Sequence, residues 1–236
     1  MSTQDIAVIL PAAGSGRRFG GEENKLFARL GTNSIWELSA RVLRGSPRVS
    51  RLIMPVSQLD RPRFESVFSE QLRELRVELA EGGAERTDSV GAGLSFVGDD
   101  AAIRLVAIHD AARPLVTAED LEAVFSRADQ TGAAILALPA TATVKQTFDS
   151  GESCETVDRE TIWLAQTPQV FDLRILREAY ARHRGRPATD DADLVQRMGK
   201  SVAMVAGSAE NIKITHPDDL AIAQAILERR GQQADG

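Results

Sequence analysis

The first residues that could do chemistry form a short segment of small residues and cations, residues 11–25. It begins Pro-Ala-Ala-Gly-Ser-Gly-Arg-Arg, and Lys25 follows seven positions after the second arginine. Gly14 and Gly16 permit positive φ angles and close approach of a ligand, so successive amides can point at an anion. Arg18 and Lys25 add positive charge that amides lack. The segment therefore predicts a phosphate site; an ordinary exposed glycine loop with surface cations is the alternative.

The segment departs from two common phosphate-binding motifs. A P-loop closes its glycine run with Gly-Lys-Ser/Thr, and that closure is absent. A dinucleotide fingerprint needs a second strand ending in an acid about 20 residues on. Here that distance falls within SIWELSARVLR, which has a helical pattern. The sequence therefore supports neither a P-loop ATPase nor a Rossmann dehydrogenase.

A second polar cluster follows a later apolar run, in the segment IHDAARP at 108–114. Asp110 and Arg113 stand at the carboxyl end of a predicted strand, where open α/β sheets bind ligands. The small residues between them leave room for a ligand. The simpler interpretation is an Asp–Arg pair that caps a turn, and His109 alone is typical of a structural histidine.

Two further segments extend the candidate site. EGGAERTDSV (81–90) joins a glycine pair to a polar helix start, where Ser89 or Thr87 can contact a base edge or cap the helix. ENIKITHPDD (210–219) places Lys213 in a short β-like run before the last helix. Lys213 alone would be interpreted as a surface lysine. It is a candidate site residue only because other cations are predicted at the same site.

Other common catalytic groups are missing from the sequence. The chain has three histidines, no Cys/His spacing for a metal and no Gly-x-Ser-x-Gly elbow. These absences argue against zinc chemistry and serine-type acyl transfer, and they predict no protein-built metal site. The chemistry is therefore expected to depend on cations and backbone amides rather than on a nucleophile or a strong base.

Composition bounds the class of protein. The chain has 236 residues, 43% of them hydrophobic and 26% charged, as in a globular domain. Its net charge of −6 argues against a nucleic-acid partner. No apolar run is long enough for a membrane span, and the first residues lack a signal-peptide pattern. With one cysteine, Cys154, no internal disulfide can form, and we expect a cytoplasmic location.

The elements that must position these residues follow from the apolar runs. Strand-length runs occur at 5–10, 51–56, 76–80, 103–108, 133–138 and 201–206. Helical patterns separate them, with starts at Ser34, Pro62, Thr117 and Pro217. This alternation predicts an α/β fold, one Rossmann-like domain over 1–236 with a mostly parallel, doubly wound sheet.

Two local features qualify that pattern. Pro55 inside the second run predicts an edge strand or an early strand end. The segment from about 141 to 167 breaks the strand–helix alternation, because two threonine- and valine-bearing runs flank Asp149-Ser150-Gly151. It predicts a β-hairpin arm that leaves the main sheet.

Taken together, the motifs resemble those of the 2-C-methyl-D-erythritol 4-phosphate cytidylyltransferases. They span nearly the whole chain in the order of that family. The matching segments are PAAGSGRR (11–18) with Lys25, GGAER (82–86), HDAARP (109–114), VDR (157–159), QTPQVF (166–171), TDD (189–191) and NIKIT (211–215).

The resemblance implies a nucleotidyltransferase that needs CTP and Mg²⁺, with the metal held mainly by the CTP phosphates, and a homodimer joined by the arm. It assigns nucleotide binding to Pro11, Ala12, Ala13, Gly14, Gly16, Gly83, Ser89, Asp110 and Ala111. It assigns catalysis to Arg18 and Lys25, which would stabilise the transition state, and to Arg159 and Lys213, which would position the acceptor phosphate. It assigns acceptor binding to Thr143, Arg113, Thr167 and Thr189.

Two alternatives remain open from the residues. Leu26, Ala84 and Ala142 depart from the usual family pattern. Because Ala142 stands where an acid commonly precedes the threonine, a ribitol-5-phosphate cytidylyltransferase is the alternative enzyme. A non-catalytic nucleotide-binding module is the alternative of another class, and it should tolerate loss of Arg18 or Lys25.

Overall fold

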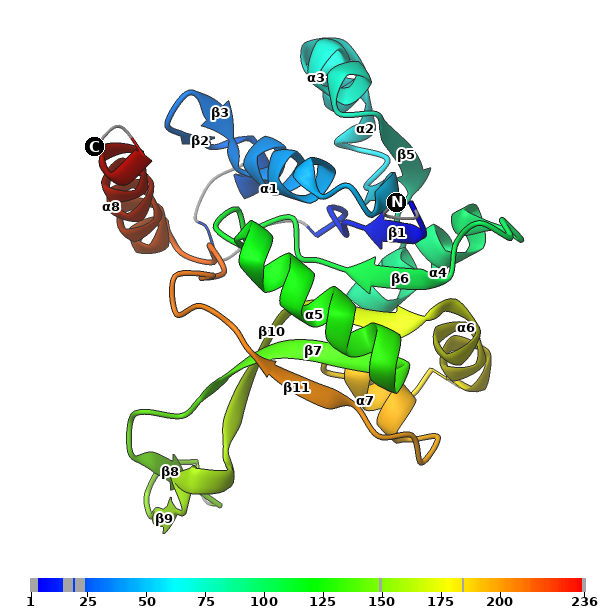
Figure 1. Ribbon diagram of the computed structural model, residues 1–236. Helices are drawn as coiled ribbons and strands as arrows, with labels where there is room; N and C mark the ends of the chain where they lie inside the picture. The colour runs from blue at the N-terminus through cyan, green and yellow to red at the C-terminus, as the bar shows by residue number, and fades with distance from the viewer. Residues whose placement is uncertain (1–3, 15–18, 20–23, 149, 184, 235–236) are drawn as a thin grey trace.

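The computed structural model describes residues 4–14, 19, 24–148, 150–183 and 185–234, and its centre is a seven-stranded sheet (Figure 1). The strand order is β11-β7-β10-β6-β1-β4-β5. The strands are β1 Ile6–Ile9, β4 Val49–Val56, β5 Val77–Glu81, β6 Leu105–Ile108, β7 Ala133–Pro139, β10 Trp163–Asp172 and β11 Ala203–Ala206. All six predicted strands are present, and the predicted α/β class is confirmed.

The sheet is parallel except at one strand. β1 pairs in parallel with β4 and β6, β4 with β5, and β7 with β11. β10 runs antiparallel between β6 and β7. The carboxyl ends of β1, β5 and β6 therefore meet at one edge of the sheet, and the predicted binding segments follow these three strands.

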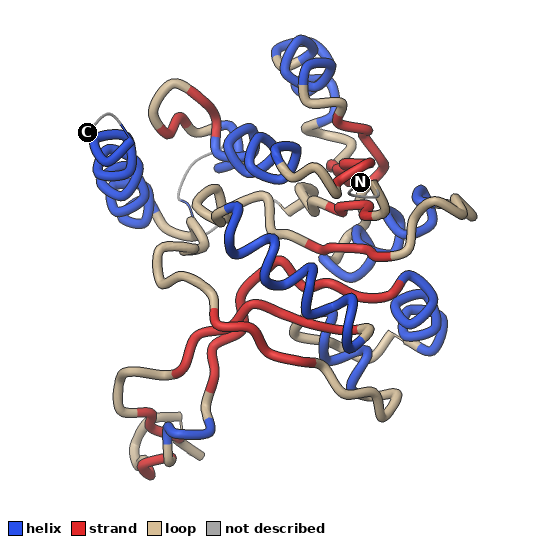
Figure 2. The backbone as a smooth tube through the Cα atoms, in the orientation of Figure 1, coloured by secondary structure: helices blue, strands red, loops and turns tan. Residues whose placement is uncertain are grey.

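Helices cover both faces of the sheet (Figures 1 and 2). Side chains of α1, α2, α5 and α8 pack in one apolar core, and those of α4, α6 and α7 in the other. Neighbouring residues of a strand alternate between the two cores, as Val8 and Ile9 do. The helices are α1 Ile35–Gly45, α2 Arg61–Val67, α3 Ser69–Glu74, α4 Arg86–Val97, α5 Ala118–Thr131, α6 Leu173–Arg182, α7 Asp191–Gln196 and α8 Pro217–Ala234.

The predicted helix starts at Thr117 and Ser34 are confirmed by hydrogen bonds at their caps. Thr117 Oγ1 accepts a hydrogen bond from the Asp120 amide at 3.1 Å, and Asp120 accepts one from the Thr117 amide in return. Glu37 accepts from the Ser34 amide at 3.4 Å at the start of α1. These bonds satisfy amides that the first helical turn leaves without partners.

The prediction for Pro55 is wrong. β4 lies between β1 and β5 rather than at an edge, and it continues to Val56. The carbonyl of Pro55 accepts a hydrogen bond from the Ala12 amide at 2.9 Å, so this side of Pro55 faces the chain beyond the end of β1. Proline has no amide hydrogen to donate. At Pro55 the hydrogen-bonded pairing of β4 with β1 has already ended, so no bond of the sheet is lost.

The predicted hairpin is present and leaves the body of the molecule (Figure 1). Its strands are β8 Val144–Gln146 and β9 Glu155–Val157, with Val144 opposite Val157. Residues 163–167 do not belong to it, because β10 begins at Trp163 and pairs there with Pro139 of β7. We therefore call residues 140–162 the arm. A second small hairpin, β2 Arg29–Leu30 with β3 Asn33–Ser34, was not predicted.

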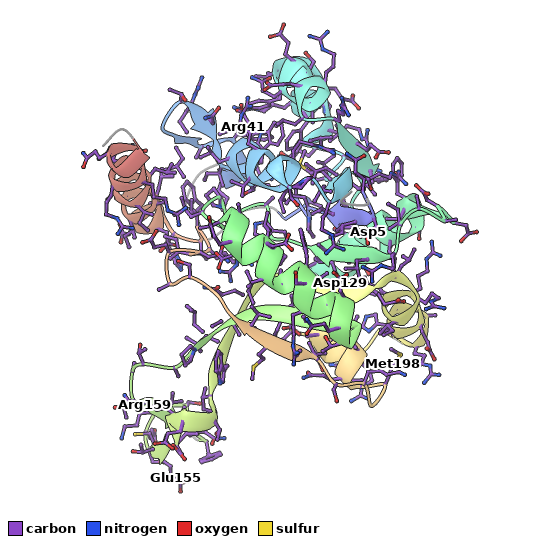
Figure 3. The ribbon with its side chains drawn as sticks, viewed as in Figure 1. Asp5, Arg41, Asp129, Glu155, Arg159 and Met198 are labelled. Atoms are coloured by element: carbon purple, nitrogen blue, oxygen red, sulfur yellow. The ribbon has the colours of Figure 1, made fainter. Side chains whose placement is uncertain are left out.

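An ion-pair network lies at the opposite end of the strands from the predicted site. Asp5, just before β1, accepts hydrogen bonds from Arg48 and Arg104 at 3.0 Å. Arg48 also donates to Asp129 at 2.8 Å, and Figure 3 shows Asp5 and Asp129 on this side of the sheet. Arg48 thus bridges two carboxylates and joins the start of the sheet to α5.

Candidate active site

A pocket of about 530 Å³ opens at the carboxyl ends of β1, β5 and β6. It is lined by Pro11, Ala12, Ala13, Gly14, Asn24, Lys25, Leu26, Gly83, Ala84, Glu85, Arg86, Ser89, Asp110, Ala111, Ala112, Lys213 and Thr215. Segments far apart in the sequence therefore meet at one place, as their positions after parallel strands predict.

Most of the predicted nucleotide-binding residues line this pocket. They are Pro11, Ala12, Ala13, Gly14, Gly83, Ser89, Asp110 and Ala111. Lys25 and Lys213, predicted to act in catalysis, line it as well. Gly16 and Arg18 lie outside the described residues.

Asp110 is the centre of the charged part of the pocket. Its Oδ1 accepts from Arg86 Nε at 3.2 Å, and its Oδ2 lies 2.8 Å from Lys213 Nζ. Arg113 Nε lies 3.8 Å from the same Oδ2. Burial alone would raise the pKa of Asp110, but the three cations outweigh burial and hold that pKa well below its usual value. The carboxylate is therefore charged, and it fixes Lys213 toward the pocket.

Lys25 stands at the start of a short 3₁₀ turn, Lys25–Phe27. Its ammonium donates to the carbonyl of Ile214 at 2.7 Å, one residue after Lys213. Leu26 and Phe27 are buried in the core beneath it. The backbone of this lysine is thus anchored by apolar packing while its ammonium lies in the pocket.

Asn24 is a pocket residue that the sequence analysis missed. Its Oδ1 accepts from the Leu26 amide at 3.1 Å and caps the 3₁₀ turn. Its Nδ2 donates to the Gly14 carbonyl at 3.2 Å and to Asp60 at 3.0 Å. Asn24 therefore ties the end of the β1 segment to the turn that carries Lys25. Asparagine before a short apolar run is a cap signal that could have indicated part of this role.

The glycine pair after β5 is held close to the β1 segment. A Cβ at Gly82 would lie 2.4 Å from the Cβ of Ala13, so only glycine fits there. Ser89 Oγ accepts from the Gly83 amide at 3.1 Å and donates to the Glu85 carbonyl at 3.2 Å. Ser89 thus fixes the 82–85 loop. A Cβ at Gly14, in contrast, would meet nothing within 4 Å and would point into open space.

Thr167 and His109 support the Asp110 segment from behind. Thr167 Oγ1 accepts from the Asp110 amide at 3.0 Å and lies 3.2 Å from His109 Nδ1. His109 Nε2 lies 3.0 Å from the Arg113 carbonyl, so it carries the proton and Nδ1 accepts from the threonine. Burial lowers the pKa of His109 to about 4, and the ring is neutral at pH 7.

Arg86 links the pocket to a second buried carboxylate, a connection that the sequence analysis missed. Arg86 Nη1 donates to Asp191 Oδ2 at 2.7 Å, and Asp191 is fully buried at the start of α7. The Tyr180 hydroxyl donates to Asp191 Oδ1 at 2.5 Å. Residues 86 and 191 are far apart in the chain, so no local pattern indicates their contact.

The remaining predicted acceptor-binding residues are not among the described residues that line the pocket. Arg113 is mostly buried and donates to the Asn211 carbonyl at 2.7 Å. Thr189 is exposed, two residues before Asp191. Thr143 and Arg159 are exposed on the arm, where Figure 3 shows Arg159, and Arg159 donates to the Thr141 carbonyl at 2.5 Å. The arm contributes none of the described residues that line the pocket.

Two kinds of feature are absent from the described residues. No group of three or more histidine, cysteine, aspartate or glutamate side chains is placed to hold a metal ion in the described parts of the chain. No helix within those parts combines the length and apolar character needed to cross a membrane.

Comparison with known proteins gives one consistent family. Residues 6–229 match the model of IspD, 2-C-methyl-D-erythritol 4-phosphate cytidylyltransferase. A protein of that name from Rhodopirellula baltica is 46% identical over 231 residues, with 94% of each chain covered. Another from Bacillus licheniformis is 38% identical, with 94% of this chain and 95% of the relative covered.

Solved structures give the same result for the fold. The crystal structure of 2-C-methyl-D-erythritol 4-phosphate cytidylyltransferase from Thermus thermophilus has a TM-score of 0.77 and 34% identity, covering 94% of this chain and 98% of its own. That of 4-diphosphocytidyl-2C-methyl-D-erythritol synthase from Anaerococcus prevotii has a TM-score of 0.81 and 26% identity, covering 95% and 98%.

Proposed function

The chain belongs to the 2-C-methyl-D-erythritol 4-phosphate cytidylyltransferase family, and from this premise we propose how its residues perform the reaction. The enzyme transfers CMP from CTP to 2-C-methyl-D-erythritol 4-phosphate and releases pyrophosphate. The residue assignments rest on the pocket. In it, Lys25 and Lys213 lie together with the accessible backbone of Ala12–Gly14 and Gly83.

The reaction needs no general base from the protein. The acceptor phosphate is already anionic at neutral pH, so one of its oxygens attacks the α-phosphorus of CTP directly. A new P–O bond forms as the bond to the pyrophosphate oxygen breaks, and the departing pyrophosphate carries away the electron pair. Catalysis then consists of positioning and electrostatic stabilisation of the charge that spreads over the α-phosphate.

The described site residues form two groups, one that binds CTP and one that binds the acceptor. The backbone of the β1 segment and of the 82–85 loop accepts CTP, and Lys25 stabilises the negative charge that grows at the α-phosphate. Lys213, fixed by its 2.8 Å contact to Asp110, positions the acceptor phosphate. Arg113, Thr167 and Thr189 would complete the acceptor half of the site. Arg18 would assist Lys25 and lies outside the described residues.

Mg²⁺ enters this proposal as part of the nucleotide substrate. Asp110 is the buried carboxylate of the pocket, and both of its oxygens contact cations of the protein, Arg86 and Lys213. We therefore take the phosphate oxygens of CTP as the main ligands of the metal, a common arrangement for Mg²⁺ with nucleotides.

Exposed apolar side chains on the arm and on the sheet support the proposal of a homodimer. Phe148 on the arm is 70% exposed, and Leu164 and Met204, on nearby strands of the sheet, are 57% and 51% exposed. An isolated two-stranded hairpin is marginally stable, and a two-fold dimer would bury these apolar side chains. In such a dimer Thr143 and Arg159 would reach the pocket of the partner subunit. The exposed Cys154 agrees with the proposed cytoplasmic, reducing location.

Pyrophosphate release tests the proposed function. CTP with 2-C-methyl-D-erythritol 4-phosphate should give rapid release, while ribitol 5-phosphate should react at least about a hundredfold more slowly in kcat/KM. ATP should be a poor replacement for CTP, because small residues at Ala12–Ala13 and Gly82–Gly83 leave a slot that fits a pyrimidine. UTP should be a poor replacement because fixed backbone amides and carbonyls there can discriminate the exocyclic amine of cytosine. Equal use of ribitol 5-phosphate would favour the alternative acceptor, and equal use of ATP would contradict the nucleotide assignment.

A further inference from the structure

Arg86 bridges two carboxylates that belong to different elements. Its Nε donates to Asp110, after β6, and its Nη1 donates to Asp191, at the start of α7. Asp191 has no exposed surface, and its second oxygen accepts from Tyr180 of α6. Burial alone would lower the pKa of Arg86, but Asp191 and Asp110 outweigh burial and raise that pKa. The guanidinium is therefore a permanent charge shared by both acids.

Both ends of this bridge lie next to the proposed acceptor-binding residues. Asp110 holds Lys213 at 2.8 Å, and Asp191 follows Thr189 by two positions. The backbone at Asp191 is fixed a second time, because Gln169 Oε1 accepts from its amide at 3.1 Å. Arg86 thus links Asp110, the partner of Lys213, to the segment that carries Thr189.

We propose that Arg86 is a positioning residue that sets the distance between Lys213 and the start of α7, and so determines affinity for the acceptor phosphate. The inference rests on the proposed function. It extends that function by naming a link between two acceptor-binding segments.

The geometry requires arginine rather than any cation. The planar guanidinium presents Nε and Nη1 in a fixed relation, so one side chain contacts two carboxylates at once. A lysine at this position would keep the charge but has one nitrogen on a flexible stem. It would bind Asp110 or Asp191 and release the other.

Apart from Asp110, which Lys213 and the Thr167 hydroxyl also hold, the nucleotide half of the pocket is fixed without the Arg86 side chain. Ser89 Oγ fixes the 82–85 loop through the Gly83 amide and the Glu85 carbonyl. Asn24 and the core beneath Lys25 fix the β1 side. Loss of the bridge should therefore affect the acceptor more than CTP.

The test compares KM for each substrate in Arg86→Lys and Tyr180→Phe. Arg86→Lys should raise KM for 2-C-methyl-D-erythritol 4-phosphate about tenfold and KM for CTP less than about twofold. Tyr180→Phe should raise the acceptor KM about threefold. Tyr180 does not line the pocket, so its effect cannot come from a lost substrate contact. The double variant should show less than the product of the single effects, because both act through Asp191.

Arg48→Lys is the matched control. Arg48 also bridges two carboxylates, Asp5 and Asp129, but at the far end of the strands. It should lower the melting temperature without changing the ratio of the two KM values. If Arg86→Lys does not fold, Tyr180→Phe alone decides the matter.

The outcomes separate this inference from the proposed function. A wild-type protein that does not use 2-C-methyl-D-erythritol 4-phosphate would refute both. An active wild type with an unchanged KM ratio in Tyr180→Phe and in folded Arg86→Lys would refute the bridge alone. An equal rise in both KM values for Arg86→Lys would also refute it.

Discussion

At the scale of single residues, Lys25 combines a fixed backbone with a charged end in the pocket. Its ammonium contacts the Ile214 carbonyl at 2.7 Å, a neutral partner that it can exchange for a phosphate oxygen. Lys25→Ala should lower kcat by about 10²–10³, because the lost contact strengthens as charge grows in the transition state. KM for CTP should change much less. Steady-state kinetics at saturating acceptor measures both.

The control for this change is Lys200→Ala, which removes an exposed lysine before β11. It should leave kcat within about twofold of wild type. Turnover of Lys25→Ala within a few-fold of wild type would show that this charge is not needed for catalysis.

His109 should make the stability of the protein depend on pH. Its pKa is lowered by burial to about 4, whereas an unfolded histidine titrates near 6.5. Between those values the unfolded chain binds a proton that the folded chain does not, so stability falls as pH drops from about 6.5 to about 4. The loss is limited to about 3 kcal/mol. Urea unfolding at about pH 7 and about pH 4.5 measures it.

His109→Gln should reduce this pH dependence, since glutamine keeps a donor for the Arg113 carbonyl but does not titrate. His216→Gln, at an exposed position, should keep the slope of the wild type. Identical slopes for wild type and His109→Gln would contradict the assigned neutral ring.

Residue types at strand ends were readable from the sequence, but their contacts were not. Lys25 and Asp110 were predicted because a cation and an acid follow apolar runs, whereas Lys213 was a candidate only because other cations were predicted at the same site. The Asp110–Arg86–Asp191–Tyr180 chain was missed, since it joins β6, α4, α7 and α6 through tertiary packing. Arg86 itself stood within a quoted motif, yet its role depends on the buried Asp191.

At the scale of elements, the approach of the β5–α4 loop to the β1 segment depends on glycine. Gly82→Ala should lower the free energy of unfolding by about 1–3 kcal/mol, because the new methyl group would overlap Ala13. Gly14→Ala should leave stability within about 0.5 kcal/mol, because a Cβ there meets no atom within 4 Å. Chemical denaturation compares the two variants.

The Gly82→Ala and Gly14→Ala variants also distinguish an effect on folding from an effect on nucleotide binding. The Gly14 methyl group would occupy space that the triphosphate needs, so KM for CTP should rise at least about tenfold in Gly14→Ala. A Gly14→Ala protein with normal CTP kinetics would place the nucleotide elsewhere in the pocket.

β10 is a strand of the main sheet that the sequence did not predict. Its sequence, WLAQTPQVFD, has no continuous apolar run, and Gln166 and Gln169 are nevertheless buried. These amides bond to other segments, as Gln166 does to the Ser208 carbonyl at 3.0 Å. The strand also pairs antiparallel, with a register shift between Ala165 and Gln169. Long-range pairing and satisfied buried amides leave no periodic signal in the sequence.

At the scale of the whole molecule, the arm places Arg159 away from its own pocket. Arg159 is exposed on the arm, and no arm residue is among the described pocket-lining residues. If Arg159 acts in the partner's pocket, two inactive variants should complement each other in mixed dimers. Lys25→Ala and Arg159→Ala are suited to this test, because each damages a different half of the composite site.

Subunit exchange between these variants gives a quantitative expectation. In a mixed dimer, the site on the Arg159→Ala subunit keeps its own Lys25 and borrows an intact Arg159, while the other site lacks both. Random exchange makes about half of the dimers mixed, so activity should recover to about a quarter of wild type. Exchange is verified by native mass spectrometry with one variant isotopically labelled. Mixed dimers without recovered activity would mean that Arg159 serves its own subunit or neither site. A protein that remains monomeric at assay concentration would refute the dimer itself.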